Sequence, residues 1–440
     1  MDVGHSAAKG HVTRPSAREQ FTVYLSGYLG TAIEWYDFYI YGVASTLIFA
    51  KIFFPDVPSW LGIIASFGTF ATGYIVRPIG AVIWGHYGDR LGRKRVLVLT
   101  ALLMGLATVL VGAMPTAAQV GLVAPLLLVL LRVVQGLAAA GEWGGASVMT
   151  SEFARPEQRG LWGSISQLGS ISGTVIATLV FTWVESLPKA AFMSWGWRLP
   201  FLAAALLVGL GLWMRFRLEE SPVFRAAQEH KDLHARVPLL ELLHKNRRGV
   251  AQALLITIGP FTASSIFLTF SVTYAVQIGY ATDTVLHAAI ICQAVSIPFI
   301  LGFGALSDRV GRRRLCSIGA VLLGVSALTV FPLINTHSPA GLYAGWLFMY
   351  VCWSMIFSIA PSFYSELFPT NTRYTGVSLG WQLSGAVGGG LTPLIASSLL
   401  LAAGGPPHTW LIGLFTALTC VGTLVGALLT PKAARAAELV

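Results

Sequence analysis

A charged segment that occurs twice is the feature that most constrains the fold of this chain. Gly85-His-Tyr-Gly-Asp-Arg-Leu-Gly-Arg-Lys-Arg95 and Gly304-Ala-Leu-Ser-Asp-Arg-Val-Gly-Arg-Arg-Arg314 share the pattern G-x-x-x-D-R-x-G-R-x-R. The two copies are offset by 219 residues, about half of the 440-residue chain, and a shorter repeat, Ser151-Glu152 and Ser365-Glu366, has an offset of 214. Two motifs that repeat in the same order at similar offsets predict a chain built from two related halves.

The composition places these halves in a membrane. Hydrophobic residues make up 55% of the chain and charged residues only 11%, with a mean hydropathy of +0.70, whereas a soluble domain carries roughly 25% charged residues. Apolar stretches of about 20 residues fit bilayer-spanning helices. The sequence therefore predicts an all-α membrane protein with twelve transmembrane helices in two pseudo-symmetric six-helix bundles. The predicted spans are 21–50, 59–84, 96–114, 121–150, 160–183, 197–215, 248–277, 283–306, 315–334, 340–366, 374–401 and 408–430.

The longest polar stretch, 216–247, separates six predicted spans from six. It is predicted to link an N-terminal half (1–215) to a C-terminal half (248–440). With the N-terminus in the cytoplasm, 24 of the 29 Lys and Arg residues lie on the cytoplasmic side, and only Lys51 and Lys189 lie on the other. Because cytoplasmic loops are rich in basic residues, we expect both termini in the cytoplasm. This distribution explains the net charge of +10 without a nucleic-acid partner.

The chain shows no pattern typical of an enzyme or of a cofactor site. Its four cysteines are isolated and lack the spacing of metal ligands, and it contains no phosphate-binding loop that would indicate direct ATP drive. The first 20 residues are polar, so we expect no removable signal peptide. We therefore expect no metal and no cofactor, and the predicted partners are the lipid bilayer, protons and a small molecule.

The repeated loop contains the residues of a conformational gate. Asp89 and Asp308 follow two predicted spans, and arginines four and six residues later can pair with these carboxylates or with nearby helix ends. Gly92 and Gly311 suit a tight turn. Ion pairs that form in one conformation and break in another act as a gate; the alternative is that the basic run only fixes the topology. The candidate gate residues are Asp89, Arg90, Gly92, Arg93, Arg95, Asp308, Arg309, Gly311, Arg312, Arg314, Glu152, Arg159, Glu366 and Arg373.

With these residues in place, the chain resembles the major facilitator superfamily over essentially its full length, and the repeated loop is similar to two characteristic loops of that superfamily. Further motifs resemble its metabolite:proton symporter family. They are Gly30-Thr-Ala-Ile-Glu-Trp-Tyr-Asp-Phe-Tyr-Ile-Tyr-Gly42, Arg77-Pro-Ile-Gly80, Arg132-Val-Val-Gln-Gly136, Gly141-Glu-Trp-Gly-Gly-Ala146, Trp195-Gly-Trp-Arg-Leu-Pro-Phe201, Glu220-Ser-Pro-Val-Phe224 and Glu366-Leu-Phe-Pro369 with Arg373-Tyr-Thr-Gly376. The resemblance implies a multi-pass protein of the bacterial inner membrane that couples proton entry to uptake of a small metabolite. Family members carry shikimate, dicarboxylates, citrate, 2-oxoglutarate or zwitterions such as proline and betaine.

Four ionisable side chains lie well inside predicted spans, all in the N-terminal half: Glu34, Asp37, Arg132 and Glu142. Such groups cost roughly 2.5–3.5 kcal/mol each to insert and are usually functional. Glu34 and Asp37 share one helix face, and two adjacent carboxylates do not both ionise readily, so one can carry a proton. We predict Asp37 as the main proton carrier, coupled to Glu34. The alternative is that one of the two only neutralises a buried arginine. Glu142 is either an exit relay for the proton, a part of the gate, or structural.

Arg132 is predicted to bind a carboxylate-bearing substrate, because a guanidinium holds a carboxylate through two parallel hydrogen bonds. Without substrate it needs an internal anion, either Asp37 or Glu34. Protonation of that carboxylate then frees Arg132, so that proton and substrate bind together. The alternative is a purely structural salt bridge between two helices. Gln135, on the helix of Arg132, and Tyr41, on the helix face of Asp37, are further candidate substrate-binding residues.

The C-terminal half has no charge embedded in a predicted span, so its candidate substrate contacts are neutral: Gln293, Tyr350, Trp353, Tyr364, Trp381 and Gln382. The sequence thus predicts a secondary active transporter, functional as a monomer, that takes up a small organic acid or zwitterionic metabolite together with protons. Two alternatives stay open: an exporter or uniporter of similar fold, and a transporter-like membrane sensor.

Overall fold

The computed structural model describes residues 16–56, 59–221, 224–225 and 238–430, and every regular element among them is helical. Twelve long helical segments run along the bundle. The first six are α1 (Ala17–Ala44) continued by η1 (Ser45–Phe49) and α2 (Ala50–Phe53), α3 (Ser59–Ile75) with α4 (Arg77–Leu91), α5 (Arg93–Ala113), α7 (Val123–Phe153), α8 (Arg159–Glu185) and α10 (Leu199–Phe216).

The last six segments follow the same plan. They are α13 (Arg247–Ser265) continued by η4 (Ile266–Phe270) and α14 (Ser271–Gln277), α15 (Thr282–Val310), α16 (Arg312–Ile334), α17 (Pro339–Phe357) with α18 (Ala360–Leu367), α19 (Arg373–Ser384) continued by η5 (Gly385–Gly390) and α20 (Thr392–Ala402), and α21 (Trp410–Leu429). The short elements are α6 (Ala117–Val120), η2 (Pro156–Gln158), α9 (Lys189–Ser194), η3 (Gly196–Arg198) and α12 (Pro238–Lys245).

The segments have the length and composition of membrane helices. Within the described ranges, 10 helices are long and apolar enough to cross a bilayer. The remaining two segments depart from that pattern for visible reasons: α1 carries Glu34 and Asp37, and α3 is separated from α4 at Val76, just before Arg77-Pro78. The predicted all-α, twelve-helix membrane fold is confirmed. The limits of the two halves stay a prediction, and part of the linker 216–247 lies outside the described residues.

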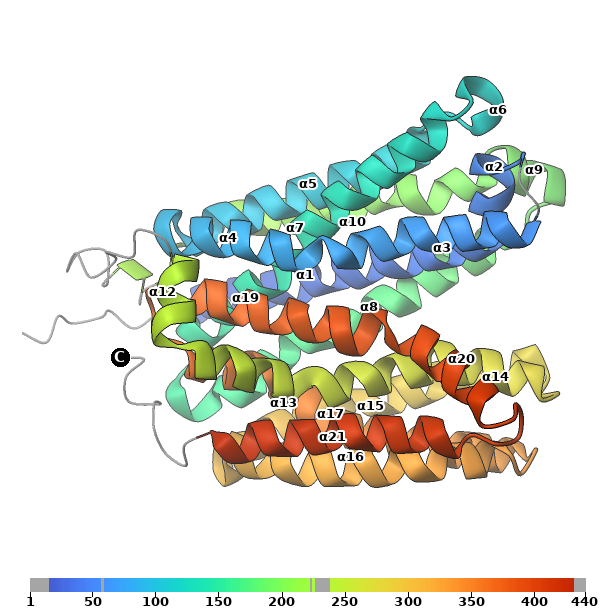
Figure 1. The fold of residues 1–440 in the computed structure, drawn as a ribbon. Helices are drawn as coiled ribbons and strands as arrows, with labels where there is room; N and C mark the ends of the chain where they lie inside the picture. The colour runs from blue at the N-terminus through green and yellow to red at the C-terminus, as the bar shows by residue number, and fades with distance from the viewer. Residues whose placement is uncertain (1–15, 57–58, 222–223, 226–237, 431–440) are drawn as a thin grey trace, which may run out of the picture.

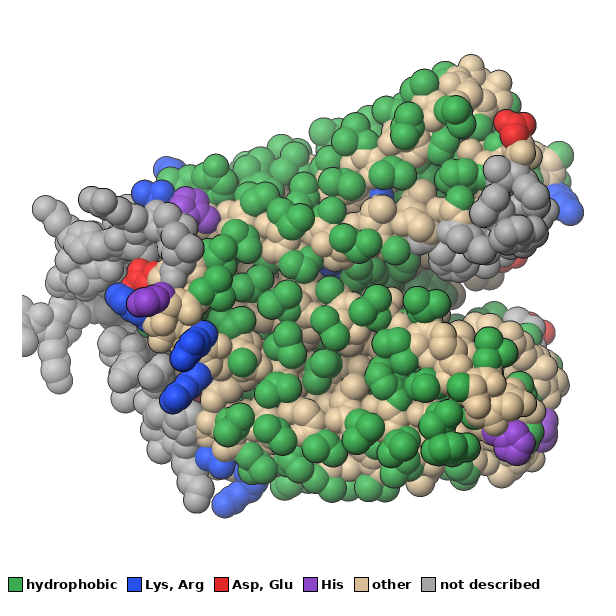
Figure 2. Space-filling model, viewed as in Figure 1, with side chains coloured by type: hydrophobic (Ala, Val, Ile, Leu, Met, Phe, Trp, Pro, Cys, Tyr) green, Lys and Arg blue, Asp and Glu red, His purple; other side chains and the backbone are tan. Residues whose placement is uncertain are grey.

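The two groups of six lie side by side, with α1–α10 (blue to green) above α13–α21 (yellow to red) in Figure 1. We call the end of the bundle that carries the turns at Gly92 and Gly311 the basic end. Lys and Arg side chains gather there at the left of Figure 2, and apolar side chains cover most of the length. Leucines such as Leu126, Leu206 and Leu418 are exposed on this surface, as expected of helices that face lipid rather than water.

The helices that meet across the two groups are placed equivalently. α4 packs against α19, and in the corresponding place α15 packs against α8. The first glycine of each repeated motif allows these crossings. A Cβ atom on Gly85 would lie 2.6 Å from Cα of Thr375, and one on Gly304 would lie 2.7 Å from Cβ of Ser164. Real Cβ atoms do not approach other atoms so closely, so both positions require glycine for close backbone packing.

Within the first group, α1 crosses α8 at small residues. A Cβ atom on Gly173 of α8 would overlap the backbone carbonyl oxygen of Ala32 and lie 3.0 Å from the backbone nitrogen of Tyr36. Backbone atoms of a packed helix cannot move aside as a flexible side chain does. The position of α1, which carries Glu34 and Asp37, therefore depends on the absence of a side chain at Gly173.

We predict that Gly173→Ala destabilises the fold by about 1–3 kcal/mol, the usual effect of overpacking a well-filled core. The measurement is the midpoint of thermal unfolding of the purified protein in detergent. Gly209→Ala in α10 is the matched control, because an added Cβ there meets nothing within 4 Å and alanine favours helix. An equal midpoint for both variants would contradict the predicted close crossing.

Candidate functional site: a gate, a buried charge network and a central pocket

Asp89 of the first motif copy joins the two groups of helices. It lies in the last turn of α4, and its carboxylate accepts hydrogen bonds from the backbone N–H groups of Tyr374 and Thr375 at 3.0 and 2.9 Å. The Thr375 hydroxyl donates a third bond at 2.8 Å. These N–H groups open α19, which has no side-chain cap of its own. A carboxylate at a helix N-terminus satisfies unpaired donors and the helix dipole together.

Asp308 of the second motif copy makes the equivalent contact in the opposite direction. Its two carboxylate oxygens accept from the backbone N–H groups of Gly160 and Leu161 at 2.8 and 3.0 Å. These residues open α8, which likewise has no side-chain cap. Arg312 donates to the same carboxylate at 2.7 Å. The repeat in the sequence is therefore a repeat in geometry, and each group of six helices caps one helix of the other.

Charged side chains extend these contacts across the basic end. Glu152, at the end of α7, accepts from Arg373 at 2.7 Å and lies 3.5 Å from Arg93. In the corresponding place Glu366 lies 3.1 Å from Arg312. The Glu152 cluster is fully buried, whereas the Glu366 side chain keeps one fifth of its surface exposed. The gate is thus symmetric in plan but more deeply buried on the Glu152 side.

Some predicted gate residues take no part in these contacts. Arg90, Arg95, Arg309 and Arg314 are exposed, and among the described residues none of them forms an ion pair. Arg159 is buried, but its guanidinium donates to the backbone oxygen of Ser151 rather than to an acidic side chain. Gly92 and Gly311 adopt φ of 108° and 89°, which explains the second glycine of the motif.

The start of the linker contributes contacts that the sequence did not predict. Glu220 accepts from the backbone N–H groups of Arg93 and Lys94 at 3.0 and 3.3 Å, and so caps α5. The Ser221 hydroxyl donates to Glu152, and the guanidinium of Arg93 lies 4.3 Å above the ring of Phe224. The motif E-S-P-V-F was recognisable in the sequence, but the residues that it contacts could not be predicted because they are far away along the chain.

A stack of aromatic rings lies between the gate and the middle of the bundle. Trp143 of α7 and Trp381 of α19 stack at 3.6 Å with an interplanar angle of 6°. The Trp143 indole donates to Gln167, and Gln382, next to Trp381, is buried. The structure therefore places Trp381 in a contact between the two groups of helices. This contact, like those of the candidate gate residues, joins the two groups of helices.

The predicted carboxylate–arginine pair is present in the first group of helices. Asp37 lies 3.2 Å from Arg132, and its other oxygen accepts from Gln135 at 2.6 Å and from the Thr108 hydroxyl at 2.5 Å. Arg132 also lies 4.2 Å above the ring of Tyr41. Asp37 and Arg132 are about 4% exposed or less. The structure brings together four of the predicted residues: Asp37, Arg132, Gln135 and Tyr41.

Two further buried pairs accompany it. Glu34 pairs with Arg77 at 3.1 Å, and Glu142 pairs with Arg215 of α10. The Arg215 side chain is only 1% exposed and turns inward to Glu142. The sequence offered no signal for this pairing, since Arg215 lies at the edge of a polar stretch. Three carboxylates and three guanidinium groups thus balance inside the bundle.

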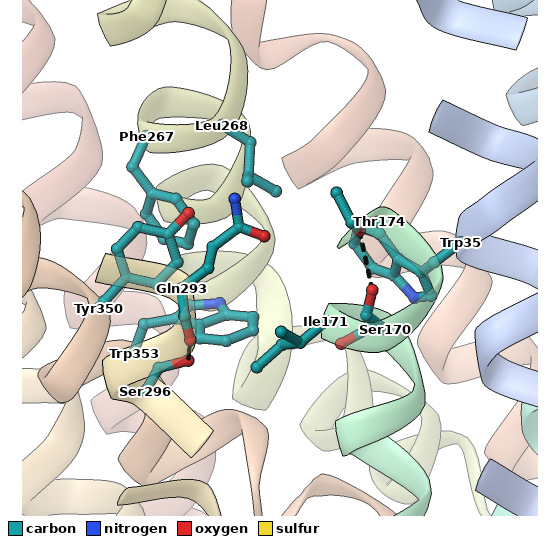
Figure 3. A pocket seen from close by; sticks show the side chains of 10 residues that line it. All are labelled: Trp35, Ser170, Ile171, Thr174, Phe267, Leu268, Gln293, Ser296, Tyr350 and Trp353. Carbon is teal, nitrogen blue, oxygen red and sulfur yellow. Dashed lines mark hydrogen bonds between the residues drawn. The ribbon is translucent and has the colours of Figure 1, made fainter. Parts of the chain in front are cut away.

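A pocket lies between the two groups of helices near the middle of the bundle. Figure 3 shows side chains of α1 and α8 on one side and of η4, α15 and α17 on the other. Its lining consists of Trp35, Ser170, Ile171, Thr174, Phe267, Leu268, Gln293, Ser296, Tyr350 and Trp353. None of these side chains carries a formal charge near neutral pH.

The predicted substrate residues divide between three places. Gln293, Tyr350 and Trp353 line the pocket, and Tyr364 lies beside Trp381. Arg132, Gln135 and Tyr41 belong to the buried charge network instead, and Trp381 and Gln382 lie nearer the basic end. Ser170 and Thr174 also line the pocket but carried no distinctive sequence signal. Hydroxyl groups and aromatic rings are common in membrane helices, so only the tertiary structure shows which of them face a cavity.

Two related groups of helices, a candidate gate at one end, buried ion pairs and a pocket between the groups are typical of a membrane transport protein. The major facilitator superfamily model matches residues 27–393, and the chain belongs to that superfamily. It is 33% identical over 416 residues to the shikimate transporter of Escherichia coli K12, with 94% of each chain covered. It is 37% identical over 420 residues to the inner membrane metabolite transport protein YhjE of the same organism, with 93% of each covered.

Other comparisons agree with this assignment. The E. coli proline/betaine transporter is 32% identical over 388 residues, covering 84% of this chain and 76% of that one. The structure of the proton:xylose symporter XylE matches with a TM-score of 0.76 at 16% identity, covering 94% of this chain and 95% of that one, which shows the same fold. The predicted resemblance is confirmed, and the chain is a multi-pass membrane transporter rather than an enzyme.

We predict that Asp89→Ala opens the basic end, because each charge-assisted hydrogen bond to the lost carboxylate contributes about 1.5–3 kcal/mol. Spin labels on cysteines introduced at the exposed positions Arg95 and Arg314 report the separation of the two groups of helices. The four native cysteines are buried and compete little for label. In Asp89→Ala we expect a new population at longer distance.

The matched control is Asp283→Ala, which removes an exposed carboxylate from the first turn of α15 at the opposite end. This variant leaves the basic-end contacts in place, so its distance distribution should equal that of the unaltered protein. Identical distributions in the two variants would show that Asp89 does not hold the gate.

Proposed function

We propose that this protein takes up a small organic acid or zwitterionic metabolite into a bacterial cell together with protons, by alternating access in the inner membrane. The buried Asp37–Arg132 pair carries the proposal. Relatives named as shikimate and proline/betaine transporters support the substrate class, and XylE, named as a proton symporter, shares the fold. The protein is proposed to work as a monomer with both termini in the cytoplasm.

Asp37 is proposed as the proton carrier. Its carboxylate is held by Arg132, Gln135 and the Thr108 hydroxyl, each of which stabilises the charged form. A proton on Asp37 leaves Arg132 as a buried cation without its partner, which is costly. Proton binding therefore destabilises this arrangement of the bundle. Because Arg132 lies on α7, protonation of Asp37 on α1 changes the contact between these two helices.

Arg132 has two proposed roles that follow from this contact. Released from a protonated Asp37, its guanidinium is available to a substrate carboxylate, as the sequence predicts. We call the conformation of this structure, with the contacts at the basic end formed, the closed state. In it the Arg132 guanidinium pairs with Asp37, and its Cζ lies 4.2 and 5.1 Å from the ring centres of Tyr41 and Phe70. Substrate binding by Arg132 thus requires that it first leave Asp37.

Glu34 and Glu142 are proposed to pass the proton toward the cytoplasm. Glu34 is one turn before Asp37 on α1, and Glu142 is about three turns nearer the basic end than Arg132 on α7. Both are buried and paired with arginine, at Arg77 and Arg215. Their protonation states are therefore tied to nearby cations, as a stepwise relay requires.

The basic end is proposed to face the cytoplasm, because loops rich in Lys and Arg are retained there. The closed state then presents the pocket to the outside. Release into the cell requires Asp89 and Asp308 to leave the helix N-termini that they cap, and the Trp143–Trp381 stack to separate. The two halves, 1–215 and 248–440, are proposed to rock about the pocket between them.

Uptake into proteoliposomes tests this function. The purified protein is reconstituted and supplied with labelled shikimate, proline, glycine betaine or a dicarboxylate, with the interior alkaline or with no pH gradient. We expect at least one compound to accumulate above its external concentration only with the gradient, and an uncoupler to abolish accumulation. Accumulation that is insensitive to the uncoupler would refute proton symport.

We predict that Asp37→Asn loses gradient-driven accumulation but retains counterflow exchange of labelled for unlabelled substrate. Asparagine keeps the size and most hydrogen bonds of Asp37 but cannot take up a proton. Without a proton on this side chain the pH gradient no longer drives uptake, so the labelled substrate only equilibrates across the membrane. Asp56→Asn, at an exposed aspartate, is the control. Full coupled uptake by Asp37→Asn assigns the proton to another group.

A further inference from the structure

Two side chains in the pocket have hydrogen-bonding capacity that the protein does not use. The Tyr350 hydroxyl is buried and has no partner among the described residues. The Gln293 side-chain amide likewise forms no hydrogen bond in the described part of the chain, although its backbone oxygen accepts from Ser296. Figure 3 shows both side chains on the α15–α17 side of the pocket. An unpartnered buried hydroxyl is unusual, because leaving it so costs free energy unless a ligand completes it.

The hydroxyls on the other side of the pocket already donate hydrogen bonds to backbone oxygens. Ser170 donates to the backbone oxygen of Gln167 at 2.7 Å, and Thr174 donates to that of Ser170 at 2.8 Å. A hydroxyl that already donates its hydrogen can still accept a hydrogen bond through the lone pairs of its oxygen. The α8 wall therefore presents acceptors, whereas Tyr350 and Gln293 can donate as well as accept.

Aromatic rings form the remaining walls. Phe267 packs against Tyr350 at 4.2 Å, and Trp353 donates its indole N–H to the backbone oxygen of Pro260 at 3.1 Å, which fixes the ring. Trp35 of α1 lies across the pocket from them (Figure 3). The faces of these rings can pack against the carbon skeleton of a ligand. Because no side chain of the lining is charged, a charged group of the ligand has to be stabilised by hydrogen bonds.

We propose that Tyr350 and Gln293 bind the carboxylate or carbonyl oxygen of the transported metabolite, and that Ser170 and Thr174 accept hydrogen bonds from its hydroxyl or N–H groups. This proposal depends on the proposed function in one respect: the pocket has to be the site where the transported metabolite binds. The substrate class is then a small hydroxylated or N–H-bearing acid, and fully N-methylated zwitterions without donors fit poorly. Arg132 does not line the pocket, so these contacts lie apart from the Asp37–Arg132 pair while that pair is intact.

Binding of matched ligand pairs to the purified full-length protein tests the proposal. One pair is a trihydroxylated cyclohexenecarboxylate and its hydroxyl-free parent acid; the other is proline and N,N-dimethylproline. Affinity is measured by isothermal titration, with quenching of tryptophan fluorescence as a second readout. We expect the donor-bearing member of each pair to bind about ten- to hundredfold more tightly, the effect of one or two hydrogen bonds to a charged or buried group.

Two variants separate the two walls. Thr174→Val keeps the shape and removes the acceptor, so it should weaken only the donor-bearing members and reduce the preference within each pair. Tyr350→Phe keeps the ring against Phe267 and should weaken all bound members about tenfold. Tyr343→Phe, on the same helix but outside the pocket lining, is the control. Unchanged melting temperatures show that the variants remain folded.

Equal affinity within both pairs, no binding by either donor-bearing ligand, or no effect of Tyr350→Phe would overturn the assignment. These outcomes differ from a failure of the proposed function. If binding shows the expected pattern while uptake ignores the pH gradient, proton coupling is refuted and the recognition residues stand. If uptake is coupled but the variants bind every ligand normally, the recognition residues lie elsewhere.

Discussion

The rest of the structure depends on two carboxylates that complete helices in the opposite half of the molecule. Asp89 bonds to the backbone N–H groups that open α19, and Asp308 bonds to those that open α8. A buried helix end needs a partner for these donors, because an unpaired buried N–H group is costly. Closing the basic end therefore satisfies both helix ends at once, and opening it transfers both carboxylates and both helix ends to water.

The symmetry of the gate contrasts with the asymmetry of the interior. The first six helices bury three carboxylate–guanidinium pairs, at Asp37, Glu34 and Glu142. The described part of the last six helices contributes uncharged groups to the pocket, such as Tyr350 and Gln293. Duplication explains the gate, since both copies need the same helix-capping contact. The proposed coupling to a proton needs one titrating centre, so only one half has to keep it.

The pocket and the gate are connected by touching aromatic rings. Trp353 stacks on Phe357 at 4.0 Å, one turn nearer the basic end, and Phe357 lies 6.1 Å from Trp381, which stacks on Trp143 of the other half. A ligand that moves Trp353 therefore acts on the contact that separates the pocket from the basic end. Packed rings have discrete arrangements rather than continuous ones, which suits an element that must be either closed or open.

The sequence by itself determined the membrane class, the twelve helices, the repeated loop motif and the buried charges Asp37 and Arg132, because hydropathy, repeats and rare buried charges are properties of short segments. Only the tertiary structure decided the partners. Glu142 pairs with Arg215, 73 residues away, and Asp89 bonds to a backbone N–H group 285 residues away. Backbone donors have no side-chain signature, and chain order does not tell which helix faces cross. For the same reason the pocket hydroxyls of Ser170 and Thr174 became visible only in three dimensions.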